Sequence, residues 1–266
     1  MTDRTQAFDR LSRDYDRFRP GYPAPVLARL CSHVLEGAHD SWPRPWLLLD
    51  VGSGTGISTR ALRRAFGPEP RVVGVEPGHA MRDTADTADT TKADDRIEYV
   101  DGRAEEVPFP TASAVLVLAA QAVHWFDRPA FYAEAARLLL PGGTVAVLDN
   151  DRDQTVGTFV DAYESLMEEH GDDYRRDYRV HDTRGEMQTQ NGLTDVVGFT
   201  TSWTRELDLE QFLGNAMSST KMAAVRRALG EERARDTLTA LATEHFPDGK
   251  VRIPYVTRLC LARRTS

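Results

Sequence analysis

Apolar residues form two kinds of pattern along the first 150 residues of this chain. In one kind they make short, nearly continuous runs, which are typical of parallel strands buried on both faces. Five such segments are predicted strands: 47–51, 71–76, 97–100, 114–120 and 144–148. In the other kind they recur at helical spacing, over 58–66, from 79 onwards and over 130–140. This alternation predicts an α/β domain with a mainly parallel sheet.

The pattern continues differently after residue 150. Helical spacing is found over 156–170, 209–217 and 222–246, and strand-like segments over 199–205 and 252–262. The connection between the fifth and sixth predicted strands is long, and such connections usually have a role of their own, as a lid or binding loop. We therefore expect residues 151–195 to cover a substrate.

An amphipathic helix is predicted near the start of the chain. Phe8, Leu11, Tyr15 and Phe18 follow an i, i+3, i+7 spacing with charged residues between them. Such aromatic residues belong to a core more often than to a site. A second helix is expected to open at Pro23, since proline suits the first turn of a helix.

The sharpest break in the apolar pattern is residues 50–56, with the sequence Asp-Val-Gly-Ser-Gly-Thr-Gly. Glycines directly after a strand allow a tight turn and a close approach of the backbone to a ligand. The spacing is not that of a dinucleotide motif, whose third glycine position is taken by Ile57, and no Lys follows as in a phosphate loop. Because Asp50 would repel a phosphate, a ligand with a cationic amine fits better.

A second acid, Glu76, ends the second predicted strand. At this place in nucleotide-binding sheets a carboxylate accepts hydrogen bonds from ribose hydroxyls. With residues 50–56 and the segment Val-Gly-Val-Glu-Pro at 73–77, the chain resembles class I S-adenosylmethionine (SAM) dependent methyltransferases. Residues 15–23 also resemble the N-terminal segment of small-molecule methyltransferases of the trans-aconitate methyltransferase type.

The resemblance implies a Rossmann-like sheet of seven strands, with helices on both faces, a helical lid insertion and an antiparallel last strand. It also implies SAM as the cofactor and S-adenosylhomocysteine as the product. The cofactor-binding residues implied are Tyr15, Asp50, Gly52, Ser53, Gly54, Glu76, Met81, Ala104 and Ala119. Met81 would pack on the adenine, with ordinary helix packing as the alternative. Arg103 stands where the family has an acid near the adenine, which leaves the backbone of Ala104 as the expected contact.

His124 and Trp125 come just after the fourth predicted strand. Ligands of open α/β sheets bind beyond the carboxyl ends of the strands, so this is where a substrate is expected. His124 is the candidate general base, because an unperturbed histidine titrates near neutral pH; a structural role is the alternative. Gln121, Trp125 and Tyr22 are candidate substrate-binding residues. A carboxylate acceptor would need no base.

The composition of the chain limits the kinds of molecule that it is expected to bind. The net charge is −8 and basic residues are scattered over 266 residues, so the chain lacks the footprint of a nucleic-acid binder. No apolar run would span a membrane and residues 1–4 do not resemble a signal peptide, so we expect a cytoplasmic protein. Cys31 and Cys260 match no metal spacing, and we expect buried, reduced thiols and no metal. A monomer or homodimer is expected.

The sequence therefore predicts a SAM-dependent methyltransferase acting on an oxygen, nitrogen or carboxyl group of a small molecule, with secondary metabolism as one setting considered. The ranges expected are an N-terminal helical segment at 1–45, a SAM-binding core at 46–150, a lid with the sixth strand at 151–250 and a final strand at 251–266. The alternative is a cyclase or isomerase that uses SAM only as a scaffold or charge. A non-catalytic interaction protein is disfavoured, because every loop glycine and Glu76 are present.

Overall fold

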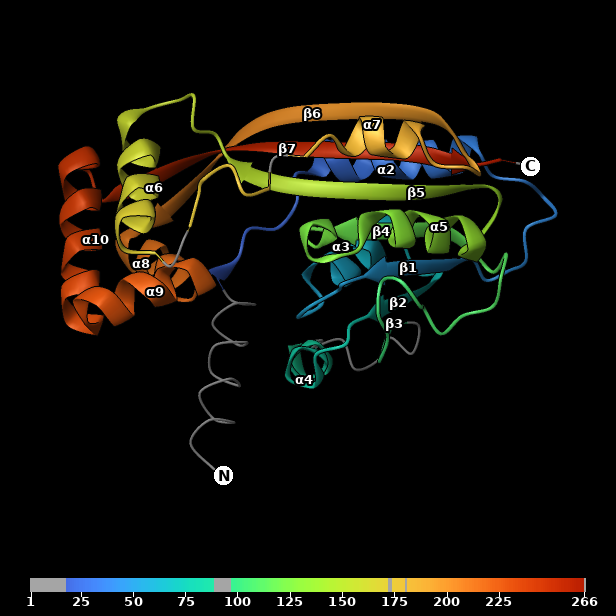
Figure 1. Ribbon diagram of the computed structural model, residues 1–266, viewed down its shortest axis with the longest axis horizontal. Helices are drawn as coiled ribbons and strands as arrows, with labels where there is room; N and C mark the ends of the chain where they lie inside the picture. Colours follow the sequence, from blue (N-terminus) through green and yellow to red (C-terminus); the bar gives the residue numbers. More distant parts are fainter. Residues whose placement is uncertain (1–17, 89–96, 172–173, 180, 266) are drawn as a thin grey trace. The chain divides into compact units, whose positions relative to one another are not determined.

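The computed structural model describes residues 18–88, 97–171, 174–179 and 181–265 (Figure 1). The chain forms two compact units from segments that are not contiguous in sequence. Unit 1 contains residues 1–20, 151–180 and 202–256, and unit 2 contains 21–150, 181–201 and 257–266. The helix predicted around residues 8–18 lies almost wholly outside the described residues.

A seven-stranded sheet carries the site, which confirms the predicted α/β fold. The strand order is β3 (Ile97–Val100), β2 (Arg71–Val75), β1 (Leu47–Val51), β4 (Ala114–Ala120), β5 (Leu139–Arg152), β7 (Lys250–Arg264) and β6 (Leu193–Asp208). The pairs β1–β2, β1–β4, β2–β3 and β4–β5 are parallel. Figure 1 shows the arrow of β7 pointing opposite to that of β5, so the sheet is mixed.

Alternate side chains of the central strands enter two different cores of unit 2. Leu47, Leu49 and Val51 of β1 belong to one cluster and Leu48 to the other. This is the period-two alternation of a strand covered on both faces. Full burial of one such Leu or Val stabilises the fold by roughly 1.5–3 kcal/mol. The apolar runs in the sequence are therefore explained by burial on both sides.

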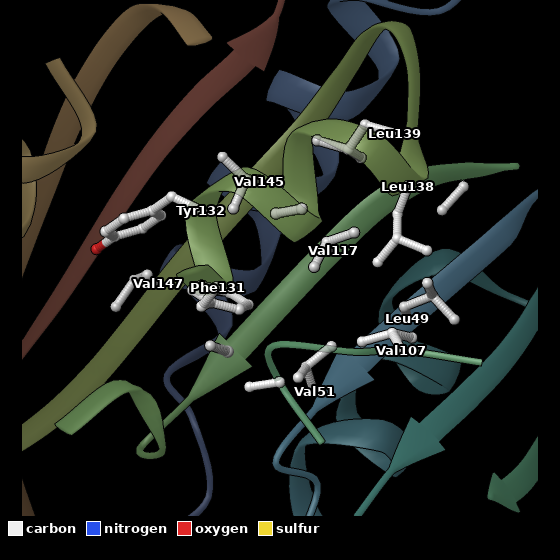
Figure 2. Packing of buried hydrophobic residues seen from close by; sticks show 14 of the residues in the cluster. Leu49, Val51, Val107, Val117, Phe131, Tyr132, Leu138, Leu139, Val145 and Val147 are labelled. Carbon is white, nitrogen blue, oxygen red and sulfur yellow. The ribbon is translucent and has the colours of Figure 1, made fainter. Parts of the chain in front are cut away.

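Helices cover both faces of the unit 2 sheet. The cluster containing Leu49 also takes in Phe131 and Tyr132 of α5 (Arg128–Leu138), as Figure 2 shows, together with Met187 of α7 (Thr183–Gln188). The cluster containing Leu48 takes in α2 (Ala24–Glu36) and Leu62 of α3 (Ile57–Phe66). A further helix, α4 (His79–Ala88), follows β2. The predicted helices at 58–66 and 130–140 agree with α3 and α5 to within two residues at each end, whereas α7 was not predicted.

Unit 1 has a separate apolar core. Its helices are α6 (Thr158–His170), α8 (Leu209–Met217), α9 (Thr220–Leu229) and α10 (Glu231–His245). Phe159, Tyr163 and Phe212 pack together in it. The ring centroid of Phe212 lies 5.6 Å from that of Phe159 and 5.8 Å from that of Tyr163. The segment predicted as helical over 222–246 is two helices, because Gly230 adopts φ 85° between them.

The compact units do not follow the ranges expected from the sequence, which stay a prediction. Residues 181–201, placed with the lid by the sequence, are counted with unit 2. Met187 and Leu193 explain this, since both are buried in the core that contains Leu49. Within the described ranges, no helix is both long enough and apolar enough to cross a membrane.

Candidate functional site

The loop between β1 and α3 is built on three glycines with left-handed backbone. Gly52, Gly54 and Gly56 have φ values of 71°, 54° and 80°, which glycine adopts without steric penalty. The N–H groups of Gly52 and Ser53 donate to the carbonyl of Val75, at 2.8 and 3.2 Å. The loop is thus fixed to the end of β2 by backbone hydrogen bonds.

The three glycines meet different surroundings. A Cβ added to Gly52 would lie 2.7 Å from the Cβ of Ala122, and one added to Gly56 would overlap the phenol of Tyr99. A Cβ added to Gly54 would meet no atom within 4 Å. Gly52 and Gly56 therefore make room for side chains of the protein itself, whereas Gly54 faces open space.

Glu76 follows β2 and holds two loops through its carboxylate. Oε2 accepts the N–H of Gly54 at 3.0 Å, and Oε1 accepts the N–H of Gly78 at 2.8 Å. The residue is partly exposed. Because each carboxylate oxygen has two lone pairs, Glu76 retains the capacity to accept hydroxyl groups of a ligand while it holds the loop.

Asp50 has 0% exposure, unlike Glu76. Its Oδ2 accepts the hydroxyls of Ser58, at 2.7 Å, and Thr59, at 2.6 Å, in the first turn of α3. Burial raises the pKa of Asp50 to about 6, and the two hydroxyl hydrogen bonds oppose part of that rise. A direct contact between Asp50 and a ligand would have to use Oδ1.

Three buried polar atoms of this loop have no hydrogen-bond partner among the described residues: Asp50 Oδ1, Ser53 Oγ and Thr55 Oγ1. The exposed fractions of Ser53 and Thr55 are 5% and 1%. Buried polar groups nearly always have a partner, and leaving one without costs roughly 1–3 kcal/mol. Together with the open space at Gly54, these atoms indicate a loop that binds a polar ligand.

The turn after β4 packs directly on Gly52. It contains a short 3-10 helix, η1 (Val123–Trp125), and the Cζ of Phe126 would lie 2.9 Å from a Cβ on Gly52. His124 is partly buried in this turn, with its ring centroid 5.1 Å from that of Trp125. Trp125 is 72% exposed. His124 and the glycine loop therefore lie at the same carboxyl edge of the sheet.

Gln121 begins this turn with φ 58°, which is rare for a residue other than glycine. Its side-chain amide donates to the carbonyl of Asn150 at 2.9 Å. Asn150 is 6% exposed; its amide donates to the carbonyl of Gly21 at 3.0 Å and accepts the hydroxyl of Thr257 at 2.5 Å. Asn150 thus connects the Gln121 turn with the segment that carries Tyr22, which packs against the core containing Leu48.

Known proteins share both the sequence and the fold of this site. A family model described as a methyltransferase domain matches residues 49–147, from β1 into β5. A candidate methyltransferase of Dictyostelium discoideum is 28% identical over 216 residues, 74% of this chain and 76% of that protein. The solved structure of a candidate type II methyltransferase from Anaeromyxobacter dehalogenans matches with a TM-score of 0.66 and 25% identity, over 93% of this chain and 98% of that one. These matches support a class I SAM-dependent methyltransferase.

Other relatives of this methyltransferase differ in how much they share. The 27-O-demethylrifamycin SV methyltransferase of Amycolatopsis mediterranei is 29% identical over 204 residues, 70% of this chain and 71% of that enzyme. An uncharacterized methyltransferase of Mycobacterium tuberculosis is 33% identical over 144 residues, and this chain spans 51% of its length. A phosphoethanolamine N-methyltransferase of Haemonchus contortus, solved in complex with SAM, has the same fold with a TM-score of 0.57 and 20% identity, over 99% of this chain and 59% of that one.

The other cofactor residues expected in this methyltransferase lie on different elements. Met81 is on α4, and its Cγ would lie 3.6 Å from a Cβ on Gly78, so it is close to the loop held by Glu76. Ala104 is 6% and Ala119 0% exposed, so contacts of these two residues with a ligand would use the backbone. Tyr15 lies outside the described residues. Their contacts with SAM, like those of the loop, stay predictions.

Tyr99 is a residue of the methyltransferase site that the sequence did not point to. It lies on β3 opposite Gly74 of β2, and a Cβ on Gly74 would lie 2.6 Å from the Cδ1 of Tyr99. The same ring fills the space beside Gly56. Tyr99 therefore packs between Gly74 of β2 and Gly56 of the glycine loop. The signal in the sequence was Gly74, a glycine inside an otherwise branched strand, which often marks a close approach.

The remaining expectations concern metals and thiols. Within the described parts of the chain, no group of three or more His, Cys, Asp or Glu side chains is placed to hold a metal ion. Both cysteines are free thiols, but only Cys260 is buried, and Cys31 is partly exposed on α2. The expectation of two buried thiols is therefore half right. Burial raises the pKa of each thiol to about 11, so neither is a reactive thiolate at neutral pH.

Proposed function

We propose that this protein transfers a methyl group from SAM to a hydroxyl, amine or carboxylate of a small molecule. The observation that carries the proposal is the glycine loop. Three buried polar atoms without a protein partner line a loop whose central glycine faces open space, and the Glu76 carboxylate beside it has free acceptor capacity. These are the features that binding of a polar nucleoside requires.

The residues of the loop fit SAM. Glu76 would accept the two ribose hydroxyls with its remaining lone pairs while its Oε2 keeps the Gly54 N–H in place. Gly54 would leave room for the backbone to approach the ligand. The unpartnered Oδ1 of Asp50 would act on the amino group, directly or through an ordered water. When bound, SAM supplies an activated methyl group on a sulfonium.

The chain's own contribution to the reaction would be alignment, exclusion of water and, for a hydroxyl or amine acceptor, proton removal. The turn that packs on Gly52 puts His124 at the same sheet edge as the loop, which supports its role as the base. Gln121, Trp125 and Tyr22 would position the acceptor. A carboxylate acceptor is already deprotonated and would need no base.

The net charge of the chain and its similarity to a named relative favour a small-molecule acceptor. The net charge of −8 disfavours nucleic acid. The Amycolatopsis relative is named for methylation of a rifamycin, and it matches over most of both chains. We propose an acceptor of comparable class, a metabolite rather than a macromolecule, and secondary metabolism as the setting.

The test of this proposal is SAM binding by isothermal titration calorimetry. A hydrogen bond to a charged group contributes roughly 1.5–3 kcal/mol, so Glu76→Ala should weaken SAM binding about tenfold to a hundredfold. The matched control is Glu98→Ala on β3, because the Glu98 carboxylate binds Arg71. A Glu76→Ala protein with the parental affinity would contradict the proposed site.

A further inference from the structure

Arg205 of unit 1 lies on a strand face that is otherwise apolar. Along β6, Trp203, Arg205 and Leu207 are buried or partly buried, while Thr204 and Glu206 between them are exposed. Alternate residues of a strand point to opposite faces. The guanidinium of Arg205 therefore shares its face with the residues that pack in the unit 1 core, and its exposed neighbour Glu206 faces away from it.

Glu206, the next residue in sequence, and Glu164, a buried carboxylate of unit 1, pair with other residues. Glu206 pairs with Lys250 at 3.6 Å and with Arg252 at 3.5 Å. Glu164, whose side chain is 2% exposed, binds Arg152 at 2.5 Å through Oε1 and accepts the Tyr174 hydroxyl at 2.7 Å through Oε2. Within the described ranges, no ion pair joins Arg205 to a carboxylate.

Among the residues that the structure describes, the hydrogen-bond acceptors of Arg205 are neutral groups. Arg205 donates to the carbonyl of Phe18 at 2.7 Å and to the hydroxyl of Tyr255. Burial lowers the pKa of Arg205, and the charge of Arg19 adds to that effect. A partly desolvated cation is unfavourable unless an anion compensates for it. An anionic ligand would supply this compensation.

Tyr255 gives the position a second donor. It is 4% exposed on β7, which lies between β5 and β6, and its ring stacks on Trp203 with centroids 5.0 Å apart. A tyrosine hydroxyl that accepts a hydrogen bond from arginine still carries its own hydrogen to donate. Tyr255 also acts electrostatically on Arg152 of β5. Arg152, Tyr255 and Arg205 thus lie on the three neighbouring strands β5, β7 and β6.

We propose that Arg205 and Tyr255 bind an anionic group, a carboxylate or a phosphate, of the acceptor substrate. The planar fork of arginine matches two oxygens of either group, and the tyrosine hydroxyl donates to one of them. The inference rests on the proposed methyl transfer for its biological meaning. Both residues belong to unit 1.

Binding of three probes of similar size tests this assignment: benzoate, phenyl phosphate and benzyl alcohol, measured by ligand-observed NMR on the full chain with S-adenosylhomocysteine present. We expect at least one anion to bind and the alcohol not to. Arg205→Gln should weaken anion binding about tenfold to a hundredfold, and Tyr255→Phe about twofold to tenfold, as expected for a charged and a neutral hydrogen bond. Comparing benzoate with phenyl phosphate identifies the preferred anion.

Arg252→Gln is the matched control, because Arg252 is an exposed arginine on β7 that pairs with Glu206 and Asp248. It should leave anion binding unchanged. Anion binding that survives both Arg205→Gln and Tyr255→Phe, or an alcohol that binds as well as the anions, would overturn the inference. SAM affinity, measured by calorimetry on the same samples, keeps the two proposals apart: its absence in the parent protein would defeat the methyltransferase proposal, whatever the anions do.

Discussion

Two carboxylates, one buried and one partly exposed, stabilise the glycine loop. Asp50 has no exposed surface and binds the first turn of α3, whereas Glu76 is partly exposed and binds the backbone of two loops. The sequence identified both acids, because each ends a strand beside glycines. It could not separate their roles, since burial depends on which face of the sheet a side chain enters. Asp50 is as much a support for the loop as a candidate contact.

Asp50 should make stability depend on pH in an unusual direction. Its pKa is raised in the folded protein to about 6, so folding favours the protonated form. Relative to Asp50→Asn, the parent should therefore lose stability as pH rises from about 4 to about 6, by about 3 kcal/mol in total. Denaturant titrations at several pH values measure this. Glu98→Gln is the control. Because the hydrogen bond from Arg71 lowers the pKa of Glu98, the parent should gain stability relative to this variant as pH rises. A pH-independent difference between parent and Asp50→Asn would refute the burial argument.

His124 should show its role in the rate and not in cofactor affinity. If the acceptor is a hydroxyl or amine, His124→Ala should slow single-turnover methyl transfer about a hundredfold to ten-thousandfold and keep SAM affinity. The parental rate should rise with pH as the base loses its proton, and the variant should lack this rise. His79→Ala is the control, since His79 is an exposed histidine on α4. Parental turnover in His124→Ala would remove this residue from the chemistry.

At the scale of elements, the sequence predicted that each strand exists, but it gave correct bounds for some strands and not for others. The predicted bounds of β3 and β4 agree with the structure, because both strands end at polar or glycine-containing turns. β5, β6 and β7 are each longer than predicted, because their ends alternate between buried and exposed residues and look like loops in sequence. Tyr99 was missed for a related reason. Its role depends on the β2–β3 register, which sets it beside Gly74.

The glycine loop offers a matched pair of substitutions. Gly54→Ala and Gly56→Ala both place a Cβ on left-handed backbone, so both bear similar conformational strain. Only Gly56→Ala also collides with Tyr99, and overpacking costs about 1–3 kcal/mol more. We expect Gly56→Ala to have the lower melting temperature and Gly54→Ala to lose SAM affinity by roughly tenfold or more, equivalent to at least about 1.4 kcal/mol. Equal melting temperatures, or parental SAM affinity in Gly54→Ala, would show that the loop geometry is misjudged.

At the scale of the whole molecule, the class of fold was predictable but its division into units was not. The order of strands and helices follows from local pattern, and the family resemblance supplied the topology. Unit 1 is assembled from three separated segments, so no local change in composition marks its limits. The anionic character that we infer for the acceptor was equally hidden. Arg205 is one of many arginines in the sequence, and only the strand pairing shows that its face is apolar.

The way in which the chain is shared between the units limits how this enzyme could acquire new acceptors. The chain passes from one unit to the other after residues 20, 150, 180, 201 and 256. A single recombination event between related genes would therefore bring together parts of unit 1 from two parents, whose cores have not evolved to fit. Replacing unit 1 as an intact cassette would require several simultaneous crossovers. Given the proposed role of Arg205 and Tyr255, new acceptor preferences are expected to arise by successive point substitutions around these two residues, and not by exchange of whole segments.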